Sequence, residues 1–130
     1  IVGALNAHRD VAAARREAIA VLERLHLDGK AGHLAASLTL PERKRLEVAR
    51  AMATRPRLLL LDEVMAGLRP TEVDEMVAVF RRINADTGLT ILLIEHVMRA
   101  VMALAQHIVV LHHGEKICEG APEVVVRDPA

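Results

Sequence analysis

Two short apolar runs separated by a helical pattern constrain the fold of this chain more than any other feature. Residues 58–61 (LLLL) and 91–94 (ILLI) are uninterrupted, and apolar side chains recur every three or four positions over residues 73–83. Such short runs are typical of strands buried on both faces, and the spacing between them is typical of a helix face. A strand, a helix and a second strand in this order predict parallel strands joined by a helical crossover.

Helical signals dominate the residues before the first apolar run. An amphipathic pattern over residues 11–27 predicts one helix, which the sequence Asp-Gly-Lys at 28–30 ends. A second helix is expected to begin after Thr39 and to run to about Ala53, because Thr39 and Glu42 have the spacing of a capping box. The front of the chain therefore has no strand of its own.

The residues after the second apolar run predict a further helix and a hairpin. Apolar positions mark a helix over residues 98–105, and residues 108–111 read as a strand that returns antiparallel through residues 115–119. The expected fold class is α/β. A helical front portion occupies residues 1–55, and residues 56–130 form part of a core of mainly parallel strands with flanking helices, a hairpin and a short last helix.

Composition excludes several classes of partner. Seventeen basic residues balance seventeen acidic ones, and aromatic residues make up 1% of the chain, so neither a global field nor a stacking platform favours nucleic acid. The apolar runs are far shorter than the roughly 20 residues of a spanning helix, so no direct membrane insertion is expected. Cys118 is the only cysteine, which excludes an internal disulfide and fits a reducing compartment.

Acidic residues follow the first apolar run and an imidazole follows the second. Because the carboxyl ends of parallel strands meet at one edge, Asp62, Glu63 and His96 are expected at a common rim. One carboxylate can hold Mg²⁺ directly or through water, its neighbour can orient a water that attacks a terminal phosphate, and the imidazole can donate to that phosphate. Taken singly, the acidic pair also fits a solvated turn and the histidine a helix cap.

Four other features have simpler interpretations. His112 and His113 adjoin on a predicted strand, so their side chains are expected on opposite faces, where they cannot easily share a metal. Met98 and Met102 share a helix face and are expected in the core, and Cys118 is expected to be a buried or half-buried thiol. The basic run at 43–45 is more typical of a charged helix face than of a nucleic-acid patch.

Read together, four segments resemble one known family. They are LTLPERKRLEVAR at 38–50, PRLLLLDE at 56–63, AGL at 66–68 and ILLIEH at 91–96. This ordered set is similar to the ATP-binding subunits of ABC transporters, most closely those of the branched-chain amino acid importer type. The resemblance implies a partial P-loop NTPase-like sheet, a helical subdomain within residues 1–55, and ATP and Mg²⁺ as cofactors.

The resemblance assigns a role to each residue of the rim. Asp62 corresponds to the Walker B aspartate, and the resemblance implies that it supports Mg²⁺ through water. Glu63 corresponds to the catalytic carboxylate that polarises the attacking water. His96 corresponds to the switch histidine that contacts the γ-phosphate.

Two further segments correspond to parts of the family's dimer interface. Residues 38–42 match the signature segment that caps the nucleotide held by the opposite subunit, contributed here by Thr39, Leu40, Pro41 and Glu42. The usual pattern is Leu-Ser-Gly-Gly-Gln. Here the threonine preserves a hydroxyl, whereas the proline removes a backbone donor and the added side chains occupy space where phosphate should approach. The loop that crosses the dimer corresponds to Ala66, Gly67, Leu68 and Arg69, and Arg69 stands where a small polar or acidic residue is usual.

The sequence contains no Gly-x-x-x-x-Gly-Lys-Ser/Thr loop and no glutamine loop ahead of the helical portion. We therefore expect the chain to be the carboxy-terminal part of a longer ATPase subunit and to be inactive alone. The implied partners are a second ATPase subunit and transmembrane permease subunits, at the cytoplasmic side of the cell membrane. The alternatives are a degenerate, non-catalytic regulatory subunit and an ABC-type ATPase of DNA maintenance, which the compact spacing over residues 38–62 disfavours.

Overall fold

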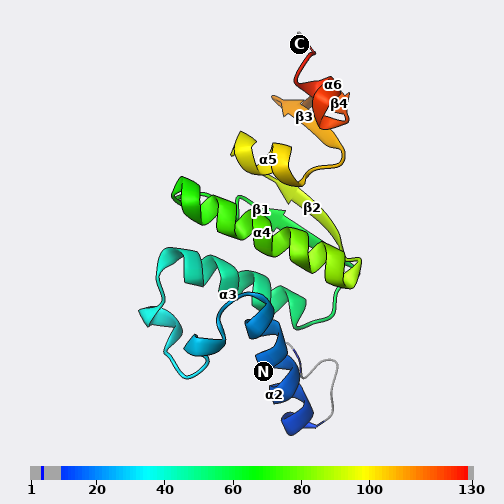
Figure 1. Cartoon of the computed structure of the whole chain (residues 1–130). Helices are drawn as coiled ribbons and strands as arrows, with labels where there is room; N and C mark the ends of the chain where they lie inside the picture. The colour runs from blue at the N-terminus through cyan, green and yellow to red at the C-terminus, as the bar shows by residue number, and fades with distance from the viewer. Residues whose placement is uncertain (1–3, 5–9, 129–130) are drawn as a thin grey trace.

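The computed structural model describes residue 4 and residues 10–128, and its elements succeed one another along the long direction of the molecule (Figure 1). The helical front lies at one end, the parallel strands lie in the middle, and a hairpin lies at the other end. The elements are the helices α2 (Val11–Arg24), α3 (Leu40–Met52), α4 (Pro70–Thr87), α5 (Met98–Leu104) and α6 (Pro122–Val125), the short 3₁₀ turns η1 (Asp28–Lys30) and η2 (Ala35–Ser37), and the strands β1 (Leu58–Asp62), β2 (Thr90–Ile94), β3 (Ile108–His112) and β4 (Glu115–Gly120).

Helix α2 begins where the sequence predicts and ends earlier. Asp10 caps it, because its two carboxylate oxygens accept hydrogen bonds from the backbone of Ala12 and Ala13 at 3.0 and 3.2 Å. The expected helix over 11–27 ends at Arg24, since His26 adopts a left-handed φ of 56°. This turn lets Leu25 and Leu27 enter the core.

The start of α3 confirms the predicted cap. The Thr39 backbone N–H donates to Glu42 Oε2 at 2.8 Å, and Lys30 Nζ lies 3.1 Å from Glu42 Oε1. The Thr39 hydrogen bond first, and the Lys30 contact second, lower the pKa of Glu42 below its ordinary value. Pro41 sits in the first turn, where its missing N–H costs no intrahelical bond.

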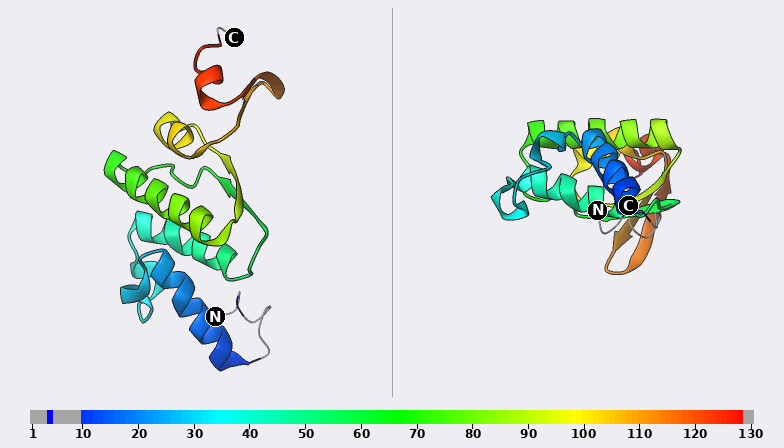
Figure 2. Two further views of the ribbon diagram at one scale, coloured as in Figure 1. Left: turned by 45° about the vertical axis from the view of Figure 1, so that its right-hand side comes forward. Right: turned by 90° about the horizontal axis from the view of Figure 1, so that it is seen from below.

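Strands β1 and β2 pair in parallel, as the sequence predicts, with α4 as the crossover between them. Their register runs from Leu58 opposite Thr90 to Asp62 opposite Ile94, so both strands end at the same level. Helix α4 ends at Gly88, which adopts a left-handed φ of 64° that favours glycine. Figure 2 shows α4 running alongside both α3 and the strand pair.

One face of the parallel pair is covered and the other is open. Leu59 and Leu61 are 3% and 7% exposed and join a core with Met76 and Phe80 of α4. Alternate side chains such as Leu60, which is 65% exposed, point away from that core. The expectation of strands buried on both faces is therefore wrong for the part of the chain that the structure describes. The apolar run is continuous, but α3 and α4 cover one side of it.

The hairpin β3–β4 forms a two-stranded antiparallel sheet of its own, with an irregularity between Val110 and Leu111. The sequence predicts this antiparallel return, but in the described residues β3 does not pair with β1 or β2. Arg81 of α4 holds the segment before the hairpin, because its Nη2 and Nε donate to the Ala103 carbonyl oxygen at 2.6 and 3.1 Å. Among the described helices, none combines the length and apolar character needed to cross a bilayer.

Three smaller predictions about side chains have mixed outcomes. Met98 and Met102 are exposed, so their placement in the core is wrong: α5 packs through Ala100 and Val101 instead. Cys118 is half-buried as predicted, and its thiol donates to Asp128 at 3.2 Å, which raises its pKa.

The two adjacent histidines also differ from expectation. The rings of His112 and His113 lie 4.1 Å apart, centroid to centroid, so the placement on opposite faces is wrong. His113 lies beyond the end of β3 and has a φ of 49°, so the alternation of side chains along a strand does not apply to it.

Candidate active site

The rim at the carboxyl ends of β1 and β2 brings together the side chains singled out by the sequence. The Glu63 backbone N–H donates to the Ile94 carbonyl oxygen at 2.9 Å, which extends the parallel ladder one residue beyond β1. His96 Nδ1 then lies 3.8 Å from Glu63 Oε1. Their side chains are 67% and 63% exposed, so both are open to a ligand from solvent. The expected common rim is present.

The backbone at Glu63 is unusual. Its φ of 45° lies in the left-handed region, which a residue with a side chain adopts at a cost of about 1–3 kcal/mol. Lys44 Nζ of α3 donates to the Glu63 carbonyl oxygen at 3.4 Å, so the helical front contacts this turn directly. Strained backbone of this kind is enriched at functional sites and is kept by the contacts around it.

Asp62 is the last residue of β1 and is exposed at the same rim. The described residues contain no cluster of three or more histidine, cysteine or acidic side chains that could hold a metal ion. Mg²⁺ is often bound by one or two carboxylates together with water and substrate phosphate oxygens. An exposed Asp62 beside Glu63 fits that donor set, and the adjacent imidazole suits an anionic phosphate. The residues described here thus fit the terminal phosphate end of Mg²⁺-ATP.

The predicted signature segment and the predicted dimer-crossing loop approach each other closely. Gly67 adopts a left-handed φ of 78°, and a Cβ added there would lie 3.3 Å from Leu40 Cδ2. Leu40 is partly exposed at the start of α3 beside Thr39, Pro41 and Glu42. Both predicted interface segments therefore lie side by side in this chain.

Arg69, the other unusual residue of the loop, is already paired. Its Nη2 and Nε lie 2.6 and 2.9 Å from Glu72 Oε1, and its backbone N–H donates to Glu72 Oε2 at 2.8 Å. The Arg69 side chain first, and its backbone N–H second, lower the pKa of Glu72. Phosphate would have to compete with this carboxylate for the guanidinium.

Glu95 is the residue of this rim that sequence reasoning missed. It sits between Ile94 and His96, and its carboxylate accepts a 2.7 Å hydrogen bond from the backbone N–H of Met65. In the sequence, the signal for this residue is an acidic side chain between the apolar run and His96. Its partner is thirty residues away in sequence, however, and cannot be identified without the fold.

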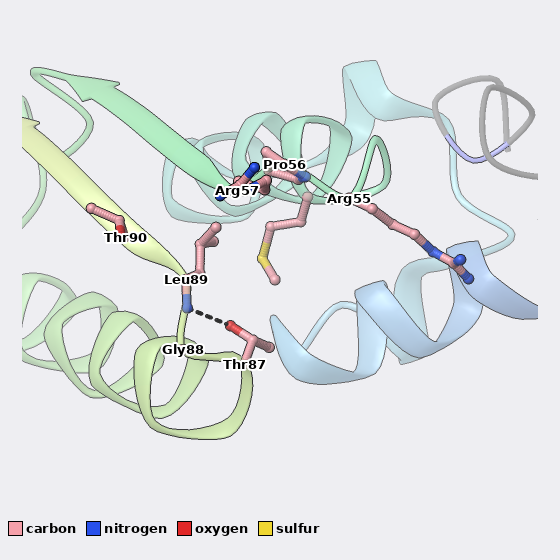
Figure 3. Close-up of a pocket in the computed structure, with 8 residues that line it drawn as sticks. Arg55, Pro56, Arg57, Thr87, Gly88, Leu89 and Thr90 are labelled. Atoms are coloured by element: carbon pink, nitrogen blue, oxygen red, sulfur yellow. Dashed lines mark hydrogen bonds between the residues drawn. The ribbon is translucent and has the colours of Figure 1, made fainter.

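A cavity of about 470 Å³ lies at the opposite end of the strands (Figure 3). Its lining includes Leu89 and Thr90 at the start of β2, and the Leu89 N–H donates to Thr87 Oγ1 at 3.2 Å beside it. Arg55 reaches away from the cavity toward α2, where its Nη2 lies 3.0 Å from Glu17 Oε2. The cavity is therefore separate from the rim, and no chemistry of Glu63 or His96 involves it.

The fold resembles part of a P-loop NTPase-like ATP-binding cassette. A nucleotide-free ATP-binding cassette from an ABC transporter has a TM-score of 0.82 and 28% identity, over 89% of this chain and 47% of that one. The ADP conformation of an ABC transporter cassette has a TM-score of 0.81 and 30% identity, over 89% of this chain and 47% of that one. The expected fold class is thus confirmed.

The sequence matches lead to the same family. Residues 3–66 match the ABC transporter family. The chain is 42% identical over 108 residues to the high-affinity branched-chain amino acid transport ATP-binding protein BraF of Pseudomonas aeruginosa, and 39% identical over 108 residues to LivG of Escherichia coli. Each match covers 83% of this chain and 42% of the relative. The methionine import ATP-binding protein MetN of Caulobacter vibrioides is 36% identical over 124 residues, 95% of this chain and 37% of the relative.

These matches confirm the resemblance to the ATP-binding proteins of ABC transporters. The chain spans less than half the length of the curated relatives it matches, 42% of BraF and 37% of MetN.

Proposed function

We propose that this chain supplies the carboxy-terminal half of the ATP-hydrolysing subunit of an ABC importer, with branched-chain amino acids as the transported class. The observation that carries the proposal is the parallel register of β1 and β2, which sets Glu63 beside His96 at one rim. Glu63 Oε1 lies 3.8 Å from His96 Nδ1. The solute class rests on the names of BraF and LivG. A methionine importer is also among the relatives, so methionine is the nearest alternative solute.

In this proposal the rim residues divide the chemistry of hydrolysis among them. Mg²⁺-ATP, when bound, supplies the γ-phosphate and partly neutralises its charge. Asp62 would support the metal through water, and Glu63 would accept a hydrogen bond from the attacking water and orient it. His96 would donate to an oxygen of the γ-phosphate and stabilise the negative charge there.

Two further segments serve the assembly. Thr39, Leu40, Pro41 and Glu42 face the nucleotide of a second ATPase subunit, and Gly67, Leu68 and Arg69 cross the interface between subunits. The close approach of Leu40 to the Gly67 position supports a shared role of the two segments at one interface. The assembled subunits couple ATP binding and hydrolysis to transmembrane permease subunits, as peripheral proteins on the inner face of the cell membrane.

The test is complementation with the amino-terminal half of a relative. This chain is co-expressed with the amino-terminal half of BraF, and ATP hydrolysis is measured for each part and for the complex. Neither part alone hydrolyses ATP. The complex does so, and Glu63→Gln lowers its turnover by about 10²-fold or more. The matched control is Glu47→Gln, an exposed glutamate of α3, which leaves turnover unchanged. Turnover by the chain alone, or a complex indifferent to Glu63→Gln, contradicts the proposal.

A non-catalytic regulatory subunit is the second candidate, and Pro41 is the observation that favours it. A proline in the first turn of α3 offers no backbone donor at a helix amino terminus that otherwise suits anions. In the same complex, Pro41→Gly raises turnover if the signature is degenerate. Thr39→Ala lowers turnover if the signature is active.

A further inference from the structure

Glu95 connects the two segments that carry the proposed catalytic pair. Its Oε1 accepts the Met65 backbone N–H at 2.7 Å, and Met65 lies two residues after Glu63. Its Oε2 accepts the backbone N–H groups of His96 at 3.2 Å and Val97 at 3.4 Å. One carboxylate thus bridges the loop after β1 and the segment after β2.

A carboxylate suits this position better than any other side chain. Three N–H donors converge on it, and an ionised carboxylate offers acceptor sites on both oxygens and no donor that would oppose them. A glutamine keeps one acceptor oxygen, so it can hold one arm of the bridge while its NH₂ group meets the N–H donors of the other. Met65 itself is buried, so its N–H would otherwise have to find another partner away from water.

The bridge lies where the backbone needs support. Glu63 adopts a left-handed φ of 45°, and its side chain is largely exposed, as is that of His96. The positions that an exposed side chain can reach are set by where its backbone lies, because its allowed rotamers depend on the backbone φ and ψ. The Glu63 N–H bond to Ile94 fixes one side of this turn, and the Glu95 bond to Met65 fixes the other.

We infer that Glu95 is a positioning residue that keeps the Glu63 turn and His96 together. Its carboxylate accepts the backbone N–H groups of Met65, His96 and Val97 and acts through them. The clamp itself is a property of this chain alone, and its effect on turnover rests on the proposed function.

The clamp is tested first without nucleotide, by NMR on this chain with Glu95, Glu95→Gln or Glu95→Ala. We expect amide exchange of Met65 to accelerate at least tenfold in Glu95→Ala and less in Glu95→Gln, while Leu61 and Leu92, whose N–H groups lie within the β1–β2 ladder, stay protected. The cross-peak between the His96 ring and the Glu63 side chain should weaken in the same order. The control Glu47→Ala changes neither signal.

Unchanged Met65 exchange and an unchanged cross-peak in a folded Glu95→Ala overturn the inference. If Glu95→Ala does not fold, Glu95→Gln, which has the same shape, decides: because its single acceptor oxygen can hold only one arm, unchanged amide exchange at Met65, His96 and Val97 together overturns the inference. A fall in strand protection equal to that at Met65 also overturns it, because the residue would then support the whole fold.

The second test uses turnover in the complemented ATPase. Glu95→Ala should lower kcat by tenfold or more with little change in KM for ATP, and Glu95→Gln should recover part of the loss. Equal kcat in all three proteins overturns the catalytic part of the inference. A complex that is inactive even with Glu95 intact contradicts the proposed function instead, and the exchange measurement still decides whether the clamp exists.

Discussion

Both faces of the β1–β2 pair carry apolar side chains, but one face is buried and the other is exposed to solvent. On one face Leu59 and Leu61 pack against α4 in the core, and on the other Leu60 and Ile94 are exposed to solvent. The covered face and the parallel hydrogen bonds hold the strands in register, and that register places Glu63 beside His96. The comparison teaches that the geometry of the rim depends on one packed face of the sheet.

The largest loss of stability is expected when a large side chain is removed from α4, the helix that covers the buried face. Phe80 of α4 is 1% exposed, so Phe80→Ala should lower the free energy of unfolding by about 3–5 kcal/mol through lost burial and a cavity. Urea denaturation followed by circular dichroism measures the change. A loss below about 1 kcal/mol would mean that α4 does not cover the sheet as described.

Neighbouring residues of β1 sharpen the comparison, because they differ mainly in the face they occupy. Leu59→Ala should cost about 2–4 kcal/mol of unfolding free energy, whereas Leu60→Ala should cost about 0.5 kcal/mol or less. The same denaturation measurement serves both variants. Equal losses, or a larger loss at Leu60, would show that the open face is covered in solution.

The turn that ends the covering helix should have a moderate effect. Gly88 has a left-handed φ of 64° and free space around its Cα, so Gly88→Ala should cost about 1 kcal/mol through backbone strain without a steric clash. Gly29, which also has open space around it and has no left-handed φ, is the matched control. If Gly29→Ala destabilises the protein as much as Gly88→Ala does, backbone strain at Gly88 is not the cause.

The smallest effect concerns the amino end of α3, the second helix of the covered side. The Thr39 N–H first and Lys30 second lower the folded-state pKa of Glu42, so its contribution to stability is present above the unfolded-state pKa. It is lost as the pH falls through the lower, folded-state value. Glu42→Gln should therefore be less stable than the unmodified chain at neutral pH, and the difference should shrink well below about pH 4.3.

Urea midpoints at several pH values measure this difference. Lys30→Ala should remove a smaller part of the pH dependence than Glu42→Gln does, because the Thr39 N–H is the larger cause. A Glu42→Gln difference that grows as the pH falls would contradict the assignment.

Periodicity alone predicted the order of the elements, the parallel pair and the hairpin, because each signal is local. It also placed Asp62, Glu63 and His96 at one rim, since parallel strands bring their carboxyl ends to a common edge. It could not show which face of the sheet α4 covers, because Leu59 and Leu60 are the same residue type. It also missed Glu95, whose role depends on a backbone N–H thirty positions earlier in the chain.

The exposed Met98 gives the same lesson for helices. A methionine at helical spacing indicates a shared face, but whether that face is buried depends on what packs against it. Here α5 is anchored by Arg99, whose Nε and Nη2 lie 2.6 Å from the Asp74 carboxylate oxygens, and by its buried Ala100. Met98, next to Arg99, remains exposed to solvent.

The central claim is the placement of Glu63 on the ladder next to β2, and the coupling across its hydrogen bond tests this most directly. An NMR experiment on the labelled chain can detect scalar coupling between the amide nitrogen of one residue and the carbonyl carbon that accepts its hydrogen bond. The structure predicts such a coupling from Glu63 to Ile94, with an N···O distance of 2.9 Å. A coupling from Glu63 to any other carbonyl would separate Glu63 from His96 and contradict the account.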